Sequence, residues 1–289
     1  MKSFETGRVI SEEKNKKESA PDIKKLWSRG VIYEDFGKRY RQIGMDNALD
    51  HFFKSLNISP VFSKQLESPE KFLEMRKKLH EEPGIIISNH PGFFDMFLIL
   101  KALEGRDDYK ILVKPTIYEN RSRTLGENHV VSVKSKDPSK KNLDHFLESA
   151  KEAISNGELF LFFPTAGNER QSREFDFKRG LTSLVKEINP ATMIYCFYVN
   201  YGDVENTIGP DWRKSHLRRD LRYAGANMEN TFRSEKINFN KLTKPKEIEV
   251  DEMYTESGEW KDSLSEAANP EEALTDHYLK IFGLNKRLT

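Results

Sequence analysis

The fold of this chain is decided by a short stretch that runs from an apolar segment through a turn: Gly84-Ile85-Ile86-Ile87-Ser88-Asn89-His90-Pro91-Gly92-Phe93-Phe94-Asp95. Three consecutive isoleucines after a glycine predict a short strand that is buried on both faces. The apolar run stops at Ser88, and Pro91-Gly92 breaks any regular structure. Because helical character resumes at Phe93, we expect His90 and Asp95 to lie on a strand-to-helix turn.

The spacing of His90 and Asp95 suggests a functional pair. On a continuous helix, four intervening residues would turn the two side chains away from each other. A turn at Pro91-Gly92 lets the carboxylate reach the imidazole instead. A carboxylate on one ring nitrogen fixes the tautomer and leaves the other nitrogen free as a base. The alternative interpretation is a helix-capping aspartate near an ordinary, partly buried histidine.

Composition limits the classes of function that remain. The 289 residues fit one large domain or a core with a small helical appendage. With 47 basic and 46 acidic residues the net charge is +1, so no nucleic-acid partner is expected. Cys196 is the only cysteine, which excludes disulfides within the chain and predicts a buried thiol. His90, His129 and His145 lack metal-ligand spacing, so no metal is expected.

The N-terminal residues and the apolar stretches bear on location. Residues 1–20 are rich in lysine and glutamate, and we expect a disordered tail without a signal peptide. The longest apolar stretches, around 93–103 and 158–163, are shorter than the span of about 20 residues that crosses a bilayer. The expectation is a cytoplasmic protein, soluble or attached peripherally to the cytoplasmic face of a membrane.

Residues 21–80 are predicted to be helical throughout. Apolar side chains recur at helical spacing in one stripe: Met45, Leu49, Phe52, Phe53 and Leu56. Ser68 and Pro69 predict the cap and first turn of a further helix. Two interpretations of the apolar faces remain open, namely packing on the core and docking on a membrane.

Residues 81–289 are predicted to form an α/β domain. Apolar strand patterns at 109–113, 129–133, 159–163 and 193–199 alternate with helical patterns, one of them ended by Gly157. This alternation predicts a layered, mostly parallel or mixed sheet flanked by helices. Residues 240–250 predict a short β element, and Asn269-Pro270 the start of a final helix.

A second stretch suggests anion binding. The strand at 159–163 runs through Pro164 into small and polar residues, and the following loop contains Arg170. A small-residue turn beyond a strand lets backbone N–H groups approach an anion, and a guanidinium offers a planar fork for phosphate. The alternative interpretation is a basic surface loop.

Together these stretches resemble the motifs of the glycerolipid acyltransferases, the lysophosphatidic-acid-acyltransferase-like family. Asn89-His90, four residues and Asp95 match the first motif, and Phe177-Lys178-Arg179-Gly180 matches a Phe-Lys-x-Gly run. Where the family has Phe-Pro-Glu-Gly-Thr-Arg, this chain keeps Phe163-Pro164 and has Thr165 for the glutamate. Its glycine and arginine arrive later, as Gly167 and Arg170.

Two lysines match the family more weakly. Lys114 follows an apolar strand, as a lysine usually does in the family. Lys134 stands where the family's second motif has an arginine, and it is equally consistent with a solvated lysine at a strand end. A lysine is a point charge, so phosphate geometry at that position would be looser than with an arginine fork.

The resemblance implies an O-acyltransferase in which His90, oriented by Asp95, is the general base. The donor is then an acyl thioester, acyl-CoA or acyl-carrier protein, with no further cofactor. The acceptor is a hydroxyl of a glycerol phosphate, lysophosphatidate or related polar lipid. Substrate or phosphate contacts are expected from a set of seven residues: Asn89, Lys114, Lys134, Thr165, Gly167, Arg170 and Lys178.

Three further expectations complete the functional interpretation. The locally basic stretch 212–222 is compatible with a solvated helix face, with attraction to an anionic membrane or with attraction to an acidic carrier protein. A non-catalytic lipid- or anion-binding homologue is an alternative to the enzyme, since the 165–170 motif departs from the family. An acyl thioester or ester hydrolase using the same site is the other alternative.

Overall fold

A computed structural model describes residues 31–55, 58–63, 69–90, 95–133, 140–165, 177–200, 246–265 and 267–284. Its strands are β1 (Ile58–Ser63), β2 (Gly84–Ser88), β3 (Tyr109–Val113), β4 (Val130–Ser132), β5 (Leu159–Phe162), β6 (Met193–Asn200) and β7 (Lys246–Glu256). Its helices are α2 (Val31–Ile43), α3 (Met45–Ser55), α4 (Pro69–Glu81), α5 (Asp95–Ala102), α6 (Pro115–Leu125), the 3-10 turn η1 (Glu127–His129), α7 (Lys140–Ser155), α8 (Arg179–Glu187), α11 (Ser257–Ser265) and α12 (Pro270–Ile281).

The strands form one sheet in the order β1-β7-β6-β2-β5-β3-β4. Five of the six pairings between these strands are parallel, and only β6 and β7 run antiparallel. The predicted α/β fold with a mostly parallel sheet is therefore confirmed. The triple-isoleucine strand β2 lies in the middle of the sheet, between β5 and β6.

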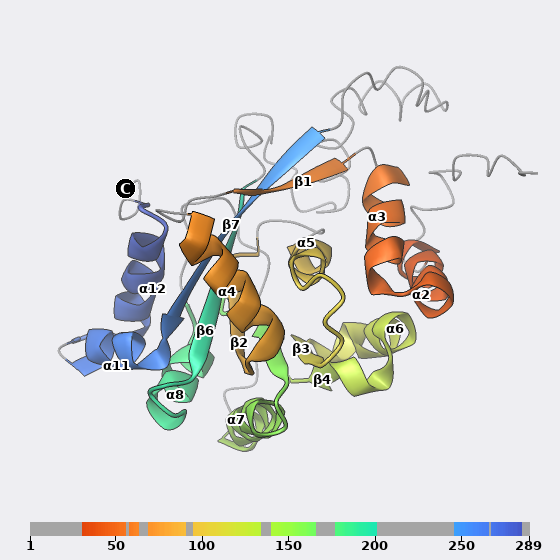
Figure 1. Ribbon diagram of the computed structural model, residues 1–289. Coiled ribbons are helices and arrows are strands. Elements are labelled where there is room, and N and C mark those ends of the chain that lie inside the picture. The colour runs from red at the N-terminus through yellow and green to blue at the C-terminus, as the bar shows by residue number, and fades with distance from the viewer. Residues whose placement is uncertain are drawn as a thin grey trace, which may run out of the picture.

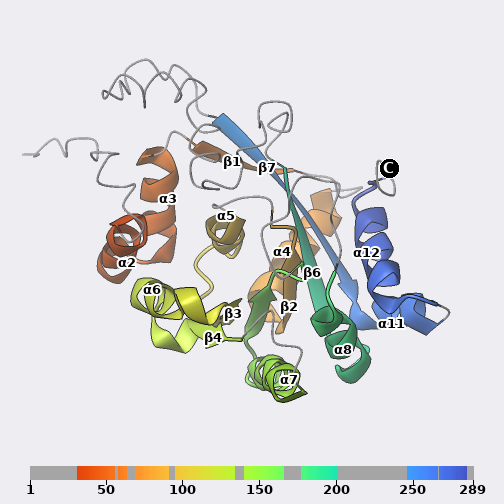
Figure 2. The same ribbon diagram turned by 180° about the vertical axis from the view of Figure 1, so that it is seen from behind.

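Successive isoleucines of β2 face opposite layers of helices, because side chains alternate along a strand. Ile86 packs in a core with residues from α2, α3, α4, α5 and α6, whereas Ile85 and Ile87 pack with residues from α7, α8, α11 and α12. All three side chains are completely buried. The views from both sides show α2, α3, α5 and α6 grouped together and α8, α11 and α12 together on the other side (Figure 1, Figure 2).

The prediction of an uninterrupted helical segment over 21–80 is wrong at 58–63. These residues form β1, which pairs in parallel with β7, a strand almost two hundred residues later in the chain. β1 lies at the edge of the sheet, where Pro60 is tolerated because the ladder has a partner on one side only. No local pattern signals such a distant pairing. Residues 1–30 and 56–57 lie outside the described residues.

The apolar stripe of α3 belongs to the protein core. Met45, Leu49, Phe52 and Phe53 are buried in the same cluster as Phe97 of α5. The rings of Phe52 and Phe97 lie 4.4 Å apart. These side chains therefore do not form a membrane-facing surface. Among the residues that the structure describes, no helix is both long and apolar enough to cross a bilayer.

Three residues that were predicted to begin or end a helix do so in the structure, and a fourth was overlooked. Gly157 follows α7 with a positive φ of 82°, a conformation that glycine adopts without strain. Asn269 caps α12, its side chain accepting a hydrogen bond from the backbone N–H of Glu272. Pro270 is at the first position of that helix. The helix α6 was not predicted, although Pro115 at its first turn is an equivalent signal.

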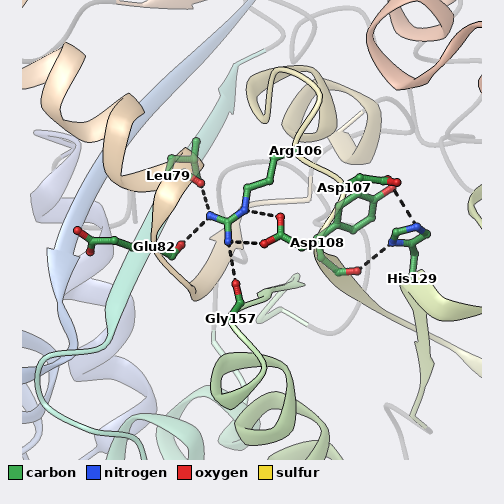
Figure 3. A network of polar contacts seen from close by, with 8 residues as sticks. Leu79, Glu82, Arg106, Asp107, Asp108, His129 and Gly157 are labelled. Carbon is green, nitrogen blue, oxygen red and sulfur yellow. Dashed lines mark hydrogen bonds and ion pairs between the residues drawn. The ribbon is translucent and has the colours of Figure 1, made fainter.

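One arginine connects the segments that lead into three neighbouring strands. Arg106, which is 8% exposed, donates to the carbonyl oxygens of Leu79, Glu82 and Gly157. It also forms a bidentate pair with Asp108, at 2.6 and 3.0 Å (Figure 3). Leu79 and Glu82 lie just before β2, Asp108 just before β3, and Gly157 just before β5. The guanidinium therefore holds the amino-terminal ends of these three strands together.

A second buried arginine pairs with an acid on β7. Arg76 of α4 donates to Glu252 Oε1 at 2.6 Å, and its guanidinium lies over the ring of Phe62 in β1. Glu252 is 1% exposed, and its second oxygen has no hydrogen-bond partner among the described residues. Burial raises the pKa of Glu252 from 4.5 to about 8, with the nearby Arg76 opposing the rise.

This raised pKa predicts a pH-dependent stability. A carboxyl group with a higher pKa in the folded chain than in the unfolded chain binds more protons when folded, so the free energy of unfolding should fall as pH rises from 4.5 to about 8. The slope for one such group is at most about 1.4 kcal/mol per pH unit. Burial also raises the pKa of Asp251, but only to about 6. Between pH 6 and 8, the fall in the free energy of unfolding should therefore depend mainly on Glu252, and the Glu252→Gln variant should lose most of it.

Denaturant unfolding at a series of pH values measures this slope. Glu256→Gln is a matched control, because Glu256 is an exposed acid on the same strand. It should leave the pH dependence as in the wild type. Equal slopes between pH 6 and 8 in wild type, Glu252→Gln and Glu256→Gln would contradict the assignment of the proton to Glu252.

Candidate active site

The residues singled out by the sequence follow the carboxyl ends of neighbouring parallel strands. His90 follows β2, Phe163 and Thr165 follow β5, and Lys114 follows β3. Since β2, β5 and β3 are adjacent and parallel, these residues lie along one edge of the sheet. In open α/β sheets, ligands bind outside the carboxyl ends of the strands.

His90 and Asp95 are in direct contact, as the sequence predicted. His90 Nδ1 lies 2.8 Å from Asp95 Oδ2. The Asp95 side chain is completely buried, while 24% of the His90 side chain is exposed. Asp95 is the first residue of α5, where the helix dipole favours a negative charge. Because a carboxylate only accepts hydrogen bonds, the contact places the imidazole proton on Nδ1 and leaves Nε2 as the basic nitrogen.

A second contact holds the imidazole ring from another side. The rings of His90 and Phe163 are stacked, with centroids 4.2 Å apart and planes 21° from parallel. Phe163 is partly buried and packs against the core that contains Ile86. The histidine ring is thus fixed by one polar and one apolar contact, and part of it stays exposed. Residues 91–94, between His90 and Asp95, lie outside the described residues.

Asn89, expected among the substrate contacts, is engaged within the protein. Its side chain donates to the carbonyl of Val199 at 2.9 Å and accepts from the N–H of Val199 at 2.7 Å. Its own backbone N–H donates to the hydroxyl of Tyr278 at 3.1 Å. Both groups therefore serve to hold the end of β2 against β6, and a direct contact of Asn89 with substrate stays a prediction.

The structure places three of the expected anion-binding residues at the same sheet edge. Lys114 is exposed at the start of α6, and Thr165 follows β5. The backbone N–H of Lys178 donates to the carbonyl of Pro164 at 3.0 Å, which brings the start of α8 next to the end of β5. The Lys178 side chain is exposed. Lys134, Gly167, Arg170 and the basic stretch 212–222 lie outside the described residues.

No cluster of metal-ligating side chains occurs in the described ranges. The cysteine predicted to be buried, Cys196, is completely buried. Burial raises the pKa of its thiol, so this residue is a poor candidate for a nucleophile.

Sequence reasoning missed two residues that contact the site segments from α12. Tyr278 bonds the backbone of Asn89, and Thr275 accepts from the backbone N–H of Phe177 at 3.1 Å. The spacing of Leu274, Tyr278, Ile281 and Phe282 in the sequence indicates an apolar helix face, which assigns no role to the Tyr278 hydroxyl. A buried tyrosine hydroxyl needs a hydrogen-bond partner. This need is the one feature of the sequence that could have indicated a polar contact of Tyr278.

Two of three comparisons with known proteins found a similarity. Residues 67–199 match the family model described as acyltransferase. Among solved structures, the chain is similar to the 1-acyl-sn-glycerophosphate (LPA) acyltransferase PlsC from Thermotoga maritima. That similarity covers 91% of this chain and 100% of the other, with 12% sequence identity and a TM-score of 0.45. No curated protein matches the sequence.

Proposed function

We propose that this chain, whose residues 67–199 match the acyltransferase family model, moves a fatty acyl group from an acyl thioester to a hydroxyl of a glycerolipid or related polar lipid. The observation that supports the mechanism is the 2.8 Å contact between His90 Nδ1 and Asp95 Oδ2. The matched segment includes both residues. In this proposal His90 is the general base, and Asp95 orients it.

The reaction follows from the chemistry of this pair. Nε2 of His90 removes the proton of the acceptor hydroxyl as its oxygen attacks the carbonyl carbon of the thioester. The positive charge that forms on the imidazole is stabilised by the buried carboxylate of Asp95. The tetrahedral intermediate then collapses with cleavage of the carbon–sulfur bond, and the imidazolium returns its proton to the leaving thiolate. No covalent enzyme intermediate is needed, because the acceptor hydroxyl is itself the nucleophile.

Cationic side chains at the same edge favour anionic substrates. Lys114 and Lys178 are exposed beside the ends of β3 and β5. Both are point charges that attract phosphate without the planar fork of an arginine. Phosphates occur in a phosphorylated lipid acceptor and in the CoA part of an acyl-CoA donor. We therefore propose a phosphorylated acceptor, with acyl-CoA or acyl-carrier protein as donor and no resident cofactor.

The proposal predicts acceptor-dependent release of the thiol. Purified protein is incubated with a labelled long-chain acyl-CoA, alone and with lysophosphatidate or glycerol 3-phosphate. An ester product should appear only with an acceptor, and thiol release should be much faster in its presence. Free fatty acid formed at one rate with and without acceptors would show a hydrolase instead. Binding of the thioester without any turnover would show a non-catalytic binding protein.

A further inference from the structure

The C-terminal helix α12 lies outside the segment matched by the acyltransferase model, yet it contacts both segments of the candidate site. Tyr278 bonds the backbone next to His90, and Thr275 bonds the backbone next to Lys178. We propose that Tyr278 and Thr275 are positioning residues for acyl transfer, which hold the base and the acceptor-binding segment in a fixed relative placement. This inference rests on the proposed function.

The Tyr278 hydroxyl joins two strands at the point where β2 ends. The pairing of β2 with β6 ends with Ser88 opposite Phe197. At the next position, the hydroxyl accepts from the N–H of Asn89 at 3.1 Å and donates to the carbonyl of Phe197. Tyr278 is completely buried, so water does not replace either bond. One hydroxyl thus satisfies both backbone groups and allows the chain to leave the sheet at Asn89.

The Asn89 side chain completes this anchor. It forms two hydrogen bonds with the backbone of Val199, two residues beyond Phe197 on β6. Residue 89 is then held through its peptide nitrogen and its side chain at once. His90 is the next residue, so the position of its Cα depends on this anchor. The ring contacts with Asp95 and Phe163 can form only when that position is kept.

Thr275 makes an equivalent link to the other segment. Its hydroxyl accepts from the N–H of Phe177 and donates to the carbonyl of Glu271, at 2.8 Å, within α12. The buried ring of Phe177 also meets the ring of Tyr278 edge-on, with centroids 5.2 Å apart. Lys178 follows directly. A single rigid helix therefore sets the distance between His90 and the segment that we expect to bind the acceptor phosphate.

The two links predict different kinetic defects. Tyr278→Phe keeps the ring contacts with Phe177 and Phe282 and removes only the hydroxyl. Since small displacements of a catalytic group are costly, kcat should fall about 10- to 100-fold with little change in either KM. Thr275→Val should instead raise the KM for a phosphorylated acceptor about tenfold, as expected for a weakened charge-assisted contact. Thr275→Ser, which keeps the hydroxyl, should restore the wild-type KM.

Tyr195→Phe is the matched control for the loss of a buried tyrosine hydroxyl. Tyr195 lies near Gly84 at the other end of β2, and its hydroxyl has no hydrogen-bond partner in the described part of the chain. This variant should keep the wild-type kcat. A folded Tyr278→Phe protein that also keeps the wild-type kcat would overturn the positioning role. So would equal acceptor KM values in Thr275→Val and the wild type.

Amide hydrogen exchange separates a failure of this inference from a failure of the proposed function. The N–H of Asn89 should exchange slowly in the wild type and in Tyr195→Phe, and faster in Tyr278→Phe. Unchanged exchange in Tyr278→Phe overturns the anchor, whatever the activity. An inactive wild type overturns the proposed function and the kinetic part of the inference. Fast Asn89 exchange in Tyr278→Phe would then still support the anchor itself.

Discussion

Replacement of His90 by alanine should reduce acyl transfer about 10²- to 10⁴-fold, the usual contribution of a general base. The acceptor hydroxyl would have no group to take its proton as it attacks. The fold should survive, because His90 is partly exposed at the end of β2 and is not part of either buried core. Initial rates with saturating donor and acceptor, together with circular dichroism, measure both effects.

Asp95→Asn should give a smaller loss than His90→Ala. The carboxamide lacks the charge that stabilises the imidazolium, and its N–H₂ group can turn towards Nδ1 and favour the wrong tautomer. His145→Ala is a matched control, because His145 is an exposed histidine on α7. It should keep full activity. Wild-type turnover in His90→Ala, or equal losses in His90→Ala and His145→Ala, would contradict the assigned base.

The central part of the fold was predictable because its signals are local. Three isoleucines in a row require burial on both faces, and β2 is indeed the fully buried middle strand. The strand that was missed, β1, and the strand that was predicted too short, β7, pair with each other although they lie far apart in the sequence. β1 contains Pro60 and pairs only with β7. β7 runs over Lys246–Glu256 and includes buried Asp251 and Glu252, charges that a sequence pattern assigns to solvent.

The catalytic pair of the candidate site was predictable from the sequence, whereas the contacts that hold the neighbouring backbone in place were not. The spacing of His90 and Asp95 around Pro91-Gly92 indicated their contact, since a turn predicted at Pro-Gly would let the two side chains meet. The link from Tyr278 to Asn89 spans 189 residues. The sequence around Asn89 and Tyr278 does not indicate this hydrogen bond, because a tyrosine hydroxyl can bond any backbone group that tertiary packing brings close. Asn89 likewise was expected to face substrate, and its bonds to Val199 depend on the neighbouring strand.

Arg106→Ala should lower the free energy of unfolding by about 1–3 kcal/mol, the cost of leaving buried backbone acceptors without their donor, while the half-exposed Asp108 carboxylate adds little because it stays solvated. The guanidinium donates to three backbone carbonyls, at Leu79, Glu82 and Gly157, and to the carboxylate of Asp108 (Figure 3). Alanine would leave the carbonyls at the ends of α4 and α7 without these donors. Arg106→Lys keeps the charge but lacks the fork, so its stability should be intermediate.

Denaturant unfolding with a matched control decides whether this network stabilises the fold. Arg123 is exposed on α6, and within the described residues its side chain donates to the carbonyl of Glu119 one turn earlier. Arg123→Ala should therefore change stability by less than about 0.5 kcal/mol. Because Arg106 lies at the amino-terminal edge of the sheet and His90 at the carboxyl edge, folded Arg106→Ala protein should keep its kcat. Equal stability losses in Arg106→Ala and Arg123→Ala would show that the strands β2, β3 and β5 are held together without the Arg106 network.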